Sequence, residues 1–233
     1  MTNTYVALDI ETTGLNPVND KITEIGAVKY INGIETDRIN FLVNPGIHIP
    51  ERITQITGID DNTVKDAPPI EDVITDVMDF VDGYILLGHN ICFDYKFLVV
   101  AATSVGIKYT AKGIDTHKIA RKYLPDLPHR SLEALCEYFE IETVHHRALD
   151  DAISASVIYE RLCENRDEEN FVFALEYKPV KKEPATAKQI KFLEDLIKRY
   201  KIEPEDNIKS LTQSEASRMI DNILSSYGIV HTK

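Results

Sequence analysis

The sequence predicts an α/β protein in which helices flank a mixed sheet, with a small helical module at the C-terminal end. Two observations lead to this fold class. Strand-like segments lie early in the chain, at residues 4–10, 22–30 and 34–43, and helix- and strand-like segments alternate after them. Beyond residue 163 the composition first becomes that of a linker and then returns to a helical period.

The early segments have the period of strands. In the first of them, apolar residues recur at every second position, at Val6, Leu8 and Ile10. Asn32-Gly33 separates the second segment from the third. Because both residues tolerate positive φ, they predict a tight hairpin between these two strands.

Helix and strand patterns alternate in the middle of the chain. Pro68-Pro69 begins a helix, whose apolar face consists of Ile70, Val73, Ile74, Val77 and Val81. Residues 84–87 are typical of a short buried strand, and helical patterns follow at 93–105, 131–139 and 150–163. This succession predicts that helices pack against the mixed sheet.

The C-terminal part has a different composition. Residues 164–169 are almost all charged, and residues 178–184 include two prolines and three lysines, which is typical of a linker. A helical pattern covers 186–200, and Thr212 with Glu215 forms the capping box of another helix. We therefore expect a first domain at 1–167, a linker at 168–184 and a small helical domain at 185–233, which stabilises the protein or binds a partner.

Charge and composition restrict the class of function. The 233 residues carry a formal net charge of −12, and nearly all of the excess lies before the helical module. This argues against a protein that coats nucleic acid through a broad basic surface. It is compatible with an enzyme that handles one chain end and binds metal ions, which are often the largest charges in a site.

Cysteine use and hydropathy indicate a cytoplasmic protein. The three cysteines, Cys92, Cys136 and Cys163, lack metal-ligand spacing, so we expect reduced structural thiols. No stretch reaches the length of a membrane span, and the N-terminal residues lack the order of a signal peptide. We therefore expect no membrane partner.

Two acidic residues end the first strand. Asp9 and Glu11 are two positions apart, so their side chains point to the same face. Two adjacent carboxylates repel each other unless a cation or a proton intervenes. A single D-x-E pair is more often a solvated strand end, so the pair gains meaning only together with other acids.

Asp94 is the next candidate, near the start of the helix at 93–105. It shares a helical face with apolar residues such as Phe97, Leu98 and Ala101, so it points inward. A carboxylate at a helix start can also simply interact with the helix dipole. The inward face favours function, because a buried acid needs a partner.

The segment from His145 to Asp151 supplies the third candidate group. Asp151 shares a helical stripe with Ala155 and Ile158 and faces inward, whereas Asp150 lies on a more exposed stripe. Asp151 is the better candidate ligand, and Asp150 is expected to cap the helix. His145 and His146 precede this helix on a loop, from which a histidine can reach a metal site.

Together these candidates are four carboxylates and a titratable base. Four carboxylates cannot all stay ionised in one place without compensation, and two divalent cations would neutralise them. Oxygen ligands without cysteine favour Mg²⁺ or Mn²⁺ over structural zinc.

The chain resembles the DEDDh exonucleases, above all the proofreading epsilon subunits of bacterial DNA polymerase III. The resemblance covers about residues 4–165. Three motifs carry it in the correct order, namely Leu8-Asp9-Ile10-Glu11-Thr12-Thr13-Gly14-Leu15, His89-Asn90 with Phe93-Asp94, and His146-Arg147-Ala148-Leu149-Asp150-Asp151-Ala152. Connecting segments also match, at Ile56-Thr57-Gly58-Ile59, Ile114-Asp115-Thr116 and Ser131-Leu132-Glu133-Ala134-Leu135.

The resemblance implies a ribonuclease H-like fold and a role for each motif residue. Two divalent cations would be bound by Asp9, Glu11, Asp94 and Asp151. His146 would be the general base. The pocket for the terminal nucleotide would be lined by Thr12, Thr57 and Phe93.

The function implied is 3′→5′ hydrolysis of terminal phosphodiesters of DNA to nucleoside 5′-monophosphates. The partners implied are single-stranded or frayed 3′ ends, and a DNA polymerase or other replication protein. An exoribonuclease of the same family remains open, because the metal chemistry does not read the 2′-hydroxyl. A non-catalytic polymerase-associated module would not need all five polar residues, and a carboxylate-pair glycosidase would not explain His146.

Overall fold

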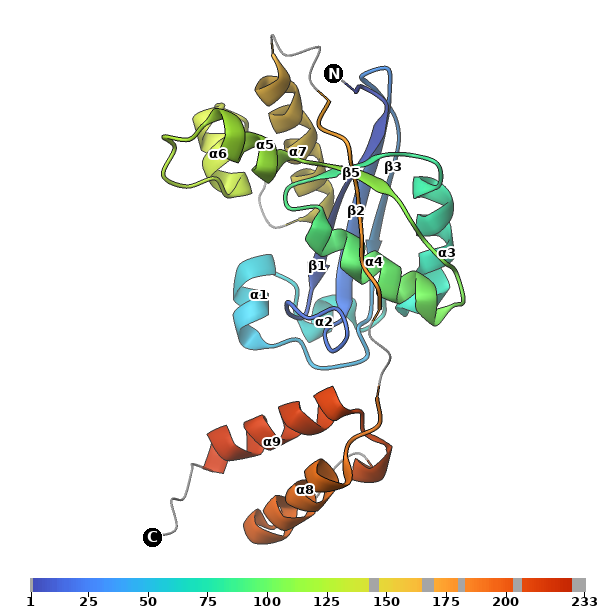
Figure 1. The fold of residues 1–233 in the computed structure, drawn as a ribbon, viewed down its shortest axis with the longest axis vertical. Coiled ribbons are helices and arrows are strands. Elements are labelled where there is room, and N and C mark those ends of the chain that lie inside the picture. Colours follow the sequence, from blue (N-terminus) through green and yellow to red (C-terminus); the bar gives the residue numbers. More distant parts are fainter. Residues whose placement is uncertain (1, 143–146, 165–169, 180–182, 203–206, 228–233) are drawn as a thin grey trace. The chain divides into compact units, whose positions relative to one another are not determined.

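The computed structural model describes residues 2–142, 147–164, 170–179, 183–202 and 207–227, and it divides the chain into two compact units (Figure 1). The first unit spans residues 1–179 and the second residues 180–233. Each unit has its own hydrophobic core.

A six-stranded mixed sheet forms the centre of the first unit, in the order β3-β2-β1-β4-β5-β6. Antiparallel pairing joins β1 (Tyr5–Thr12), β2 (Ile22–Ile31) and β3 (Ile34–Leu42). Parallel pairing adds β4 (Leu86–Gly88) and β5 (Lys112–Asp115), and β6 (Phe173–Ala174) closes the far edge antiparallel to β5. The predicted mixed sheet is confirmed.

The predicted hairpin is present between β2 and β3. Asn32 and Gly33 both adopt positive φ, at 53° and 77°. This is the left-handed conformation that a tight two-residue turn requires and that these residue types tolerate. The turn therefore helps to fix the register of β2 against β3.

Helices cover both faces of the sheet (Figure 1). The core on one face includes residues of α3 (Ile70–Val81) and α4 (Cys92–Ser104). The core on the other face includes residues of α5 (Thr116–Tyr123), α6 (Leu132–Tyr138) and α7 (Ala148–Cys163). The central strand β1 contributes to both cores, with Leu8 in the first and Ala7 in the second.

Several short elements were not predicted from the sequence. These are α1 (Glu51–Thr57), α2 (Asp61–Val64), β5, α5 and β6. Within the predicted linker at 168–184, the short strand β6 pairs with β5. Leu175 is 4% exposed and packs over Gly113, so apolar side chains attach this segment to the first unit.

The second unit is built from α8 (Ala187–Tyr200), the short 3₁₀ turn η1 (Ile208–Ser210) and α9 (Gln213–Tyr227). Its core consists of Leu193, Leu196, Ala216 and Ile223. The predicted capping box before α9 is present, because the Thr212 N–H donates to Glu215 and the Glu215 N–H donates to Thr212. In the part of the chain that the structure describes, no helix is both long and apolar enough to span a membrane.

Candidate functional site

The site begins at the end of β1. Asp9 and Glu11 lie opposite Gly26 and Glu24 of β2, on the strand face that carries Ala7 toward α7. On that side, Asp151 in the first turn of α7 is buried, with 7% exposure. Asp9, Glu11 and Asp151 each offer one carboxylate oxygen, and these oxygens lie within 4.8 Å of one another. This arrangement can hold a metal ion.

Asp94 reaches the same strand from α4. It is 3% exposed, and its Oδ1 accepts a hydrogen bond of 3.0 Å from the backbone N–H of Ile10. Ile10 stands between Asp9 and Glu11 in β1, so the fourth predicted carboxylate is tied to the strand that carries the first two. Asp94 is not among the three residues whose oxygens lie within 4.8 Å.

The carboxylates make one another harder to ionise. Burial, followed by the charges of Asp94 and Asp151, holds the pKa of Asp9 well above its usual range. Burial also raises the pKa of Asp94, against the hydrogen bonds that favour its charged form. Burial and the charge of Asp151 raise the pKa of Glu11 to about 7. Each shift has the sign that a nearby cation would oppose.

The start of α7 differs from the prediction for Asp150. The helix begins at Ala148 with Arg147 as its N-cap, so Asp150 is the third helical residue and does not cap the helix. The physical reason is a tertiary contact, because Glu24 of β2 accepts the N–H of Ala148 at 3.2 Å. His145 and His146 lie outside the residues that the structure describes.

Glu24 is a buried charge that sequence analysis did not single out. It is 0% exposed and pairs with the guanidinium of Arg147 at 2.8 Å. The hydrogen bond to Glu24, followed by the charge of Glu24, raises the pKa of Arg147. A signal was available in the sequence, because Glu24 is the one charged residue in the run from Ile22 to Val28.

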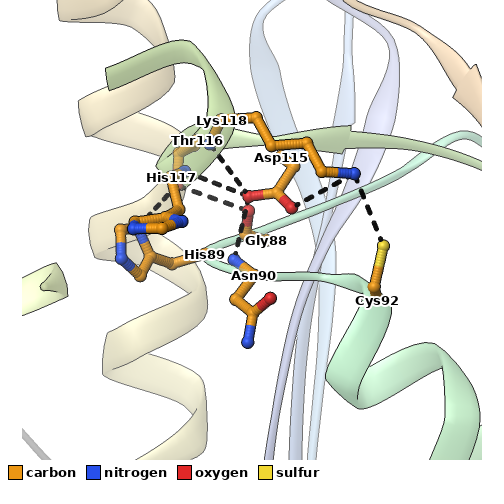
Figure 2. Close-up of polar contacts among 8 residues, drawn as sticks. All are labelled: Gly88, His89, Asn90, Cys92, Asp115, Thr116, His117 and Lys118. Carbon is orange, nitrogen blue, oxygen red and sulfur yellow. Dashed lines mark hydrogen bonds and ion pairs between the residues drawn. The ribbon is translucent and has the colours of Figure 1, made fainter. Parts of the chain in front are cut away.

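Asp115 at the end of β5 holds the loop that leads to Asp94. It is 2% exposed, and its Oδ1 accepts the backbone N–H groups of Asn90 and His117, both at 3.0 Å. Figure 2 shows these N–H groups pointing at the same carboxylate. Asn90 adopts a positive φ of 69°, so the turn before α4 is sharp. Asp115 thus joins the two parallel strands to the helix that carries Asp94.

His89 is held in the same network (Figure 2). Its Nδ1 lies 2.9 Å from the hydroxyl of Thr116, which in turn donates to the carbonyl of Gly88. Burial and the neighbouring His117 lower the pKa of His89 to about 4. His89 therefore stays neutral near pH 7 and acts here as a packed, hydrogen-bonded residue.

The three residues predicted to line a nucleotide pocket lie in different local settings. The Thr12 hydroxyl donates to the carbonyl of Gly14, and the Thr57 hydroxyl donates to the carbonyl of Ile53. Phe93 is partly buried at the start of α4, with its ring centroid 5.0 Å from that of Phe97. Both hydroxyl protons are already used within the chain, so these two hydroxyls can meet a further partner only as acceptors.

Comparisons with known proteins identify a family and several similar proteins. The model of a family described as exonuclease matches residues 6–159. A DNA polymerase III PolC-type of Caldanaerobacter subterraneus is 41% identical over 165 residues, which are 70% of this chain and 12% of that protein. A DNA polymerase III subunit epsilon of Aquifex aeolicus is 36% identical and is covered to 81% of its length, with 69% of this chain. The chain thus spans about an eighth of the PolC-type relative.

Solved structures give the same fold. Exonuclease X in complex with 5′ overhanging duplex DNA is 27% identical, with a TM-score of 0.57, over 70% of this chain and 93% of that one. The E. coli ExoI–ssDNA complex, at 18% identity and a TM-score of 0.63, covers 72% of this chain and 42% of that one and supports the fold alone. The ribonuclease H-like fold expected from the sequence is confirmed.

The raised pKa of Glu11 predicts how the stability of the metal-free protein depends on pH. Its pKa is about 7 in the folded chain against an ordinary value of 4.5, so folding favours the protonated form. This contribution is fully present below pH 4.5 and is lost as the pH rises through about 7. In chelator, the wild type should therefore lose more thermal stability across this window than the Glu11→Gln variant, which cannot ionise there.

Thermal melts of both proteins at several pH values would measure this difference. Adding a divalent cation above pH 7 should reverse the order, because the cation stabilises the ionised wild-type carboxylate. Parallel pH profiles in chelator would contradict the assigned environment of Glu11.

Proposed function

Because the chain belongs to the exonuclease family, we propose that it is a metal-dependent 3′→5′ exonuclease that shortens DNA by one nucleotide at a time. The single observation that supports this most is the convergence of Asp9, Glu11 and Asp151 within 4.8 Å. Carboxylates this close in a partly buried site are costly unless they bind cations. The products would be nucleoside 5′-monophosphates.

We propose that the site holds two divalent cations, Mg²⁺ or Mn²⁺. The donor set supports this choice, because it consists of hard carboxylate oxygens from Asp9, Glu11 and Asp151, with Asp94 as the fourth acid. Cations bound there would make water more acidic and offset the charge of the scissile phosphate.

The proposed site residues then have separate roles. The four carboxylates bind and orient the cations, and the fixed positions of β1, α4 and α7 keep these acids in place. His146 would remove the proton of the attacking water. Thr12, Thr57 and Phe93 would contact the terminal nucleotide, and Phe93 offers a partly buried ring on which a base can stack.

DNA is the proposed substrate class, and single-stranded or frayed 3′ ends are the proposed form. The similar proteins support this, because they are DNA polymerase III components and an exonuclease with bound DNA. We propose on the same basis that the protein acts in the cytoplasm, alongside a DNA polymerase or another replication protein.

A time course on 5′-labelled single-stranded DNA tests the proposed activity. The labelled strand should shorten stepwise with Mg²⁺ or Mn²⁺, and excess chelator should stop the reaction, because the carboxylates need their cations. A 3′-phosphate should slow it, and a closed circle should not be cut. A matched RNA strand decides between DNA and RNA as substrate. Undiminished cleavage in chelator, or rapid cleavage of the closed circular DNA, would contradict the proposal.

The two adjacent aspartates of α7 provide a matched pair of variants. Asp151→Asn removes a carboxylate of the converging group, so turnover should be almost lost. Asp150→Asn changes a partly exposed first-turn residue and should cost at most about 1 kcal/mol of helix-dipole stabilisation, with turnover kept. Single-turnover rates and thermal melts measure both effects. If Asp150→Asn were the inactive variant, the assignment of Asp151 would be wrong.

The two histidines before α7 provide a second matched pair. His146→Ala should lose on the order of 10²–10⁴ in turnover, the usual contribution of positioned acid–base catalysis. The acid limb of its pH–rate profile should flatten, because histidine titrates with an ordinary pKa of about 6.5. His145→Ala should keep both turnover and profile. Assays at saturating Mn²⁺ across pH decide the question, and full activity of His146→Ala would remove the base assignment.

A further inference from the structure

We infer that Glu24 and Arg147 form a positioning clamp, which docks the first turn of α7 onto β2 and thereby sets the place of Asp151 in the carboxylate group. Neither residue belongs to the proposed metal ligands. The inference rests on the proposed function, since it assigns the clamp a purpose at that site.

The docking contact lies at Gly26 of β2. A Cβ atom at this position would stand 2.1 Å from the backbone nitrogen of Leu149 and 2.3 Å from the carbonyl carbon of Ala148. The backbone of α7 thus lies directly on the strand, at the residue that pairs with Asp9. Any side chain at Gly26 would push the helix away, because backbone atoms cannot give way as the end of a side chain can.

Glu24 secures this contact from two positions away on the same face of β2. One oxygen accepts the Arg147 Nη2 group at 2.8 Å, and the other accepts the N–H of Ala148 at 3.2 Å. The carboxylate therefore binds a side chain and one of the unpaired N–H groups at the helix start. Glu24 is 0% exposed and the Arg147 side chain is 47% exposed, so the carboxylate that accepts these charge-assisted bonds is shielded from water on its own side.

The clamp affects the position of Asp151, which lies three residues after Ala148 in the same helical turn. The backbone N–H of Asp151 donates to the carbonyl of Arg147 at 2.9 Å, so the clamped residue is also the hydrogen-bond partner of the ligand residue. A change in how Arg147 sits on β2 moves the first turn and with it the carboxylate. The same contact fixes the N-cap Arg147, which directly follows His146 in the sequence.

An alternative role for Arg147 predicts a different experimental result. Its side chain is 47% exposed, so its guanidinium could face a substrate phosphate instead. In that case the loss of Arg147 would weaken binding of DNA, and Glu24 would matter little. The clamp requires that both residues affect cation binding in the absence of any DNA.

The experiment compares cation binding and catalysis in the full chain. Arg147→Met, Glu24→Gln and the double variant are measured against wild type for Mn²⁺ affinity without DNA, and then for kcat and KM on single-stranded DNA. All are compared at a temperature where circular dichroism shows them folded. The double variant leaves no unpaired buried charge, so it keeps the test valid if a single variant fails to fold.

We expect Mn²⁺ affinity and kcat to fall about 10–100-fold in Arg147→Met and in the double variant, as for other residues that orient a metal ligand. KM should change little. Arg147→Lys should recover part of the loss, because an ammonium replaces the charge but not the forked geometry. Arg38→Met is the matched control, since Arg38 pairs with Glu35 on the exposed surface of β3 and should behave as wild type.

Two results would overturn the clamp while leaving the proposed function intact. One is wild-type Mn²⁺ affinity and kcat in the folded double variant, even with a lower melting temperature. The other is a higher KM in Arg147→Met with unchanged Mn²⁺ affinity, which would make Arg147 a substrate contact. A wild-type protein that binds no Mn²⁺ and cuts no DNA would overturn the proposed function and the clamp together.

Discussion

Electrostatic repulsion at the end of β1 is the constraint on which the rest of the site depends. Asp9 and Glu11 share a face of this strand, and the fold places Asp94 and Asp151 beside them. Burial and mutual repulsion raise the pKa of Asp9 well above its ordinary range. The chain tolerates this cost because the surrounding core is apolar and well packed, and because the arrangement suits a divalent cation.

The sheet supplies the rigidity that such a site needs. β1 is the central strand and is buried on both faces, with Leu8 packed on one side and Ala7 on the other. A strand held from both sides cannot shift to relieve repulsion between its acidic residues. The helices that carry the other two carboxylates are each attached to the sheet by a buried acid. Asp115 of β5 binds the turn that precedes α4, and Glu24 of β2 binds the start of α7.

These two buried acids have the same physical role in different forms. Each accepts at least one backbone N–H near the start of a helix, which lowers the cost of burying the carboxylate. Asp115 binds N–H groups of a turn and a helix start, and Glu24 adds an ion pair with Arg147. Asp115 and Glu24 organise the backbone through these partners, whereas the carboxylates of Asp9, Glu11 and Asp151 lie close to one another and can hold a cation. The distinction lies in the partners, because the residue type is the same.

The sequence by itself determined the strand period, the hairpin at Asn32-Gly33, the capping box at Thr212 and the inward face of Asp151, because each depends on residues a few positions apart. It also identified the family, because the three motifs keep their order and spacing. Only the tertiary structure decided that α7 begins at Ala148 and not at Asp150, because the acceptor for its first N–H lies on β2, over 120 residues earlier in the chain. For the same reason Glu24 and Gly26 gained meaning only from the fold, since no local pattern links a strand residue to a helix that distant in sequence.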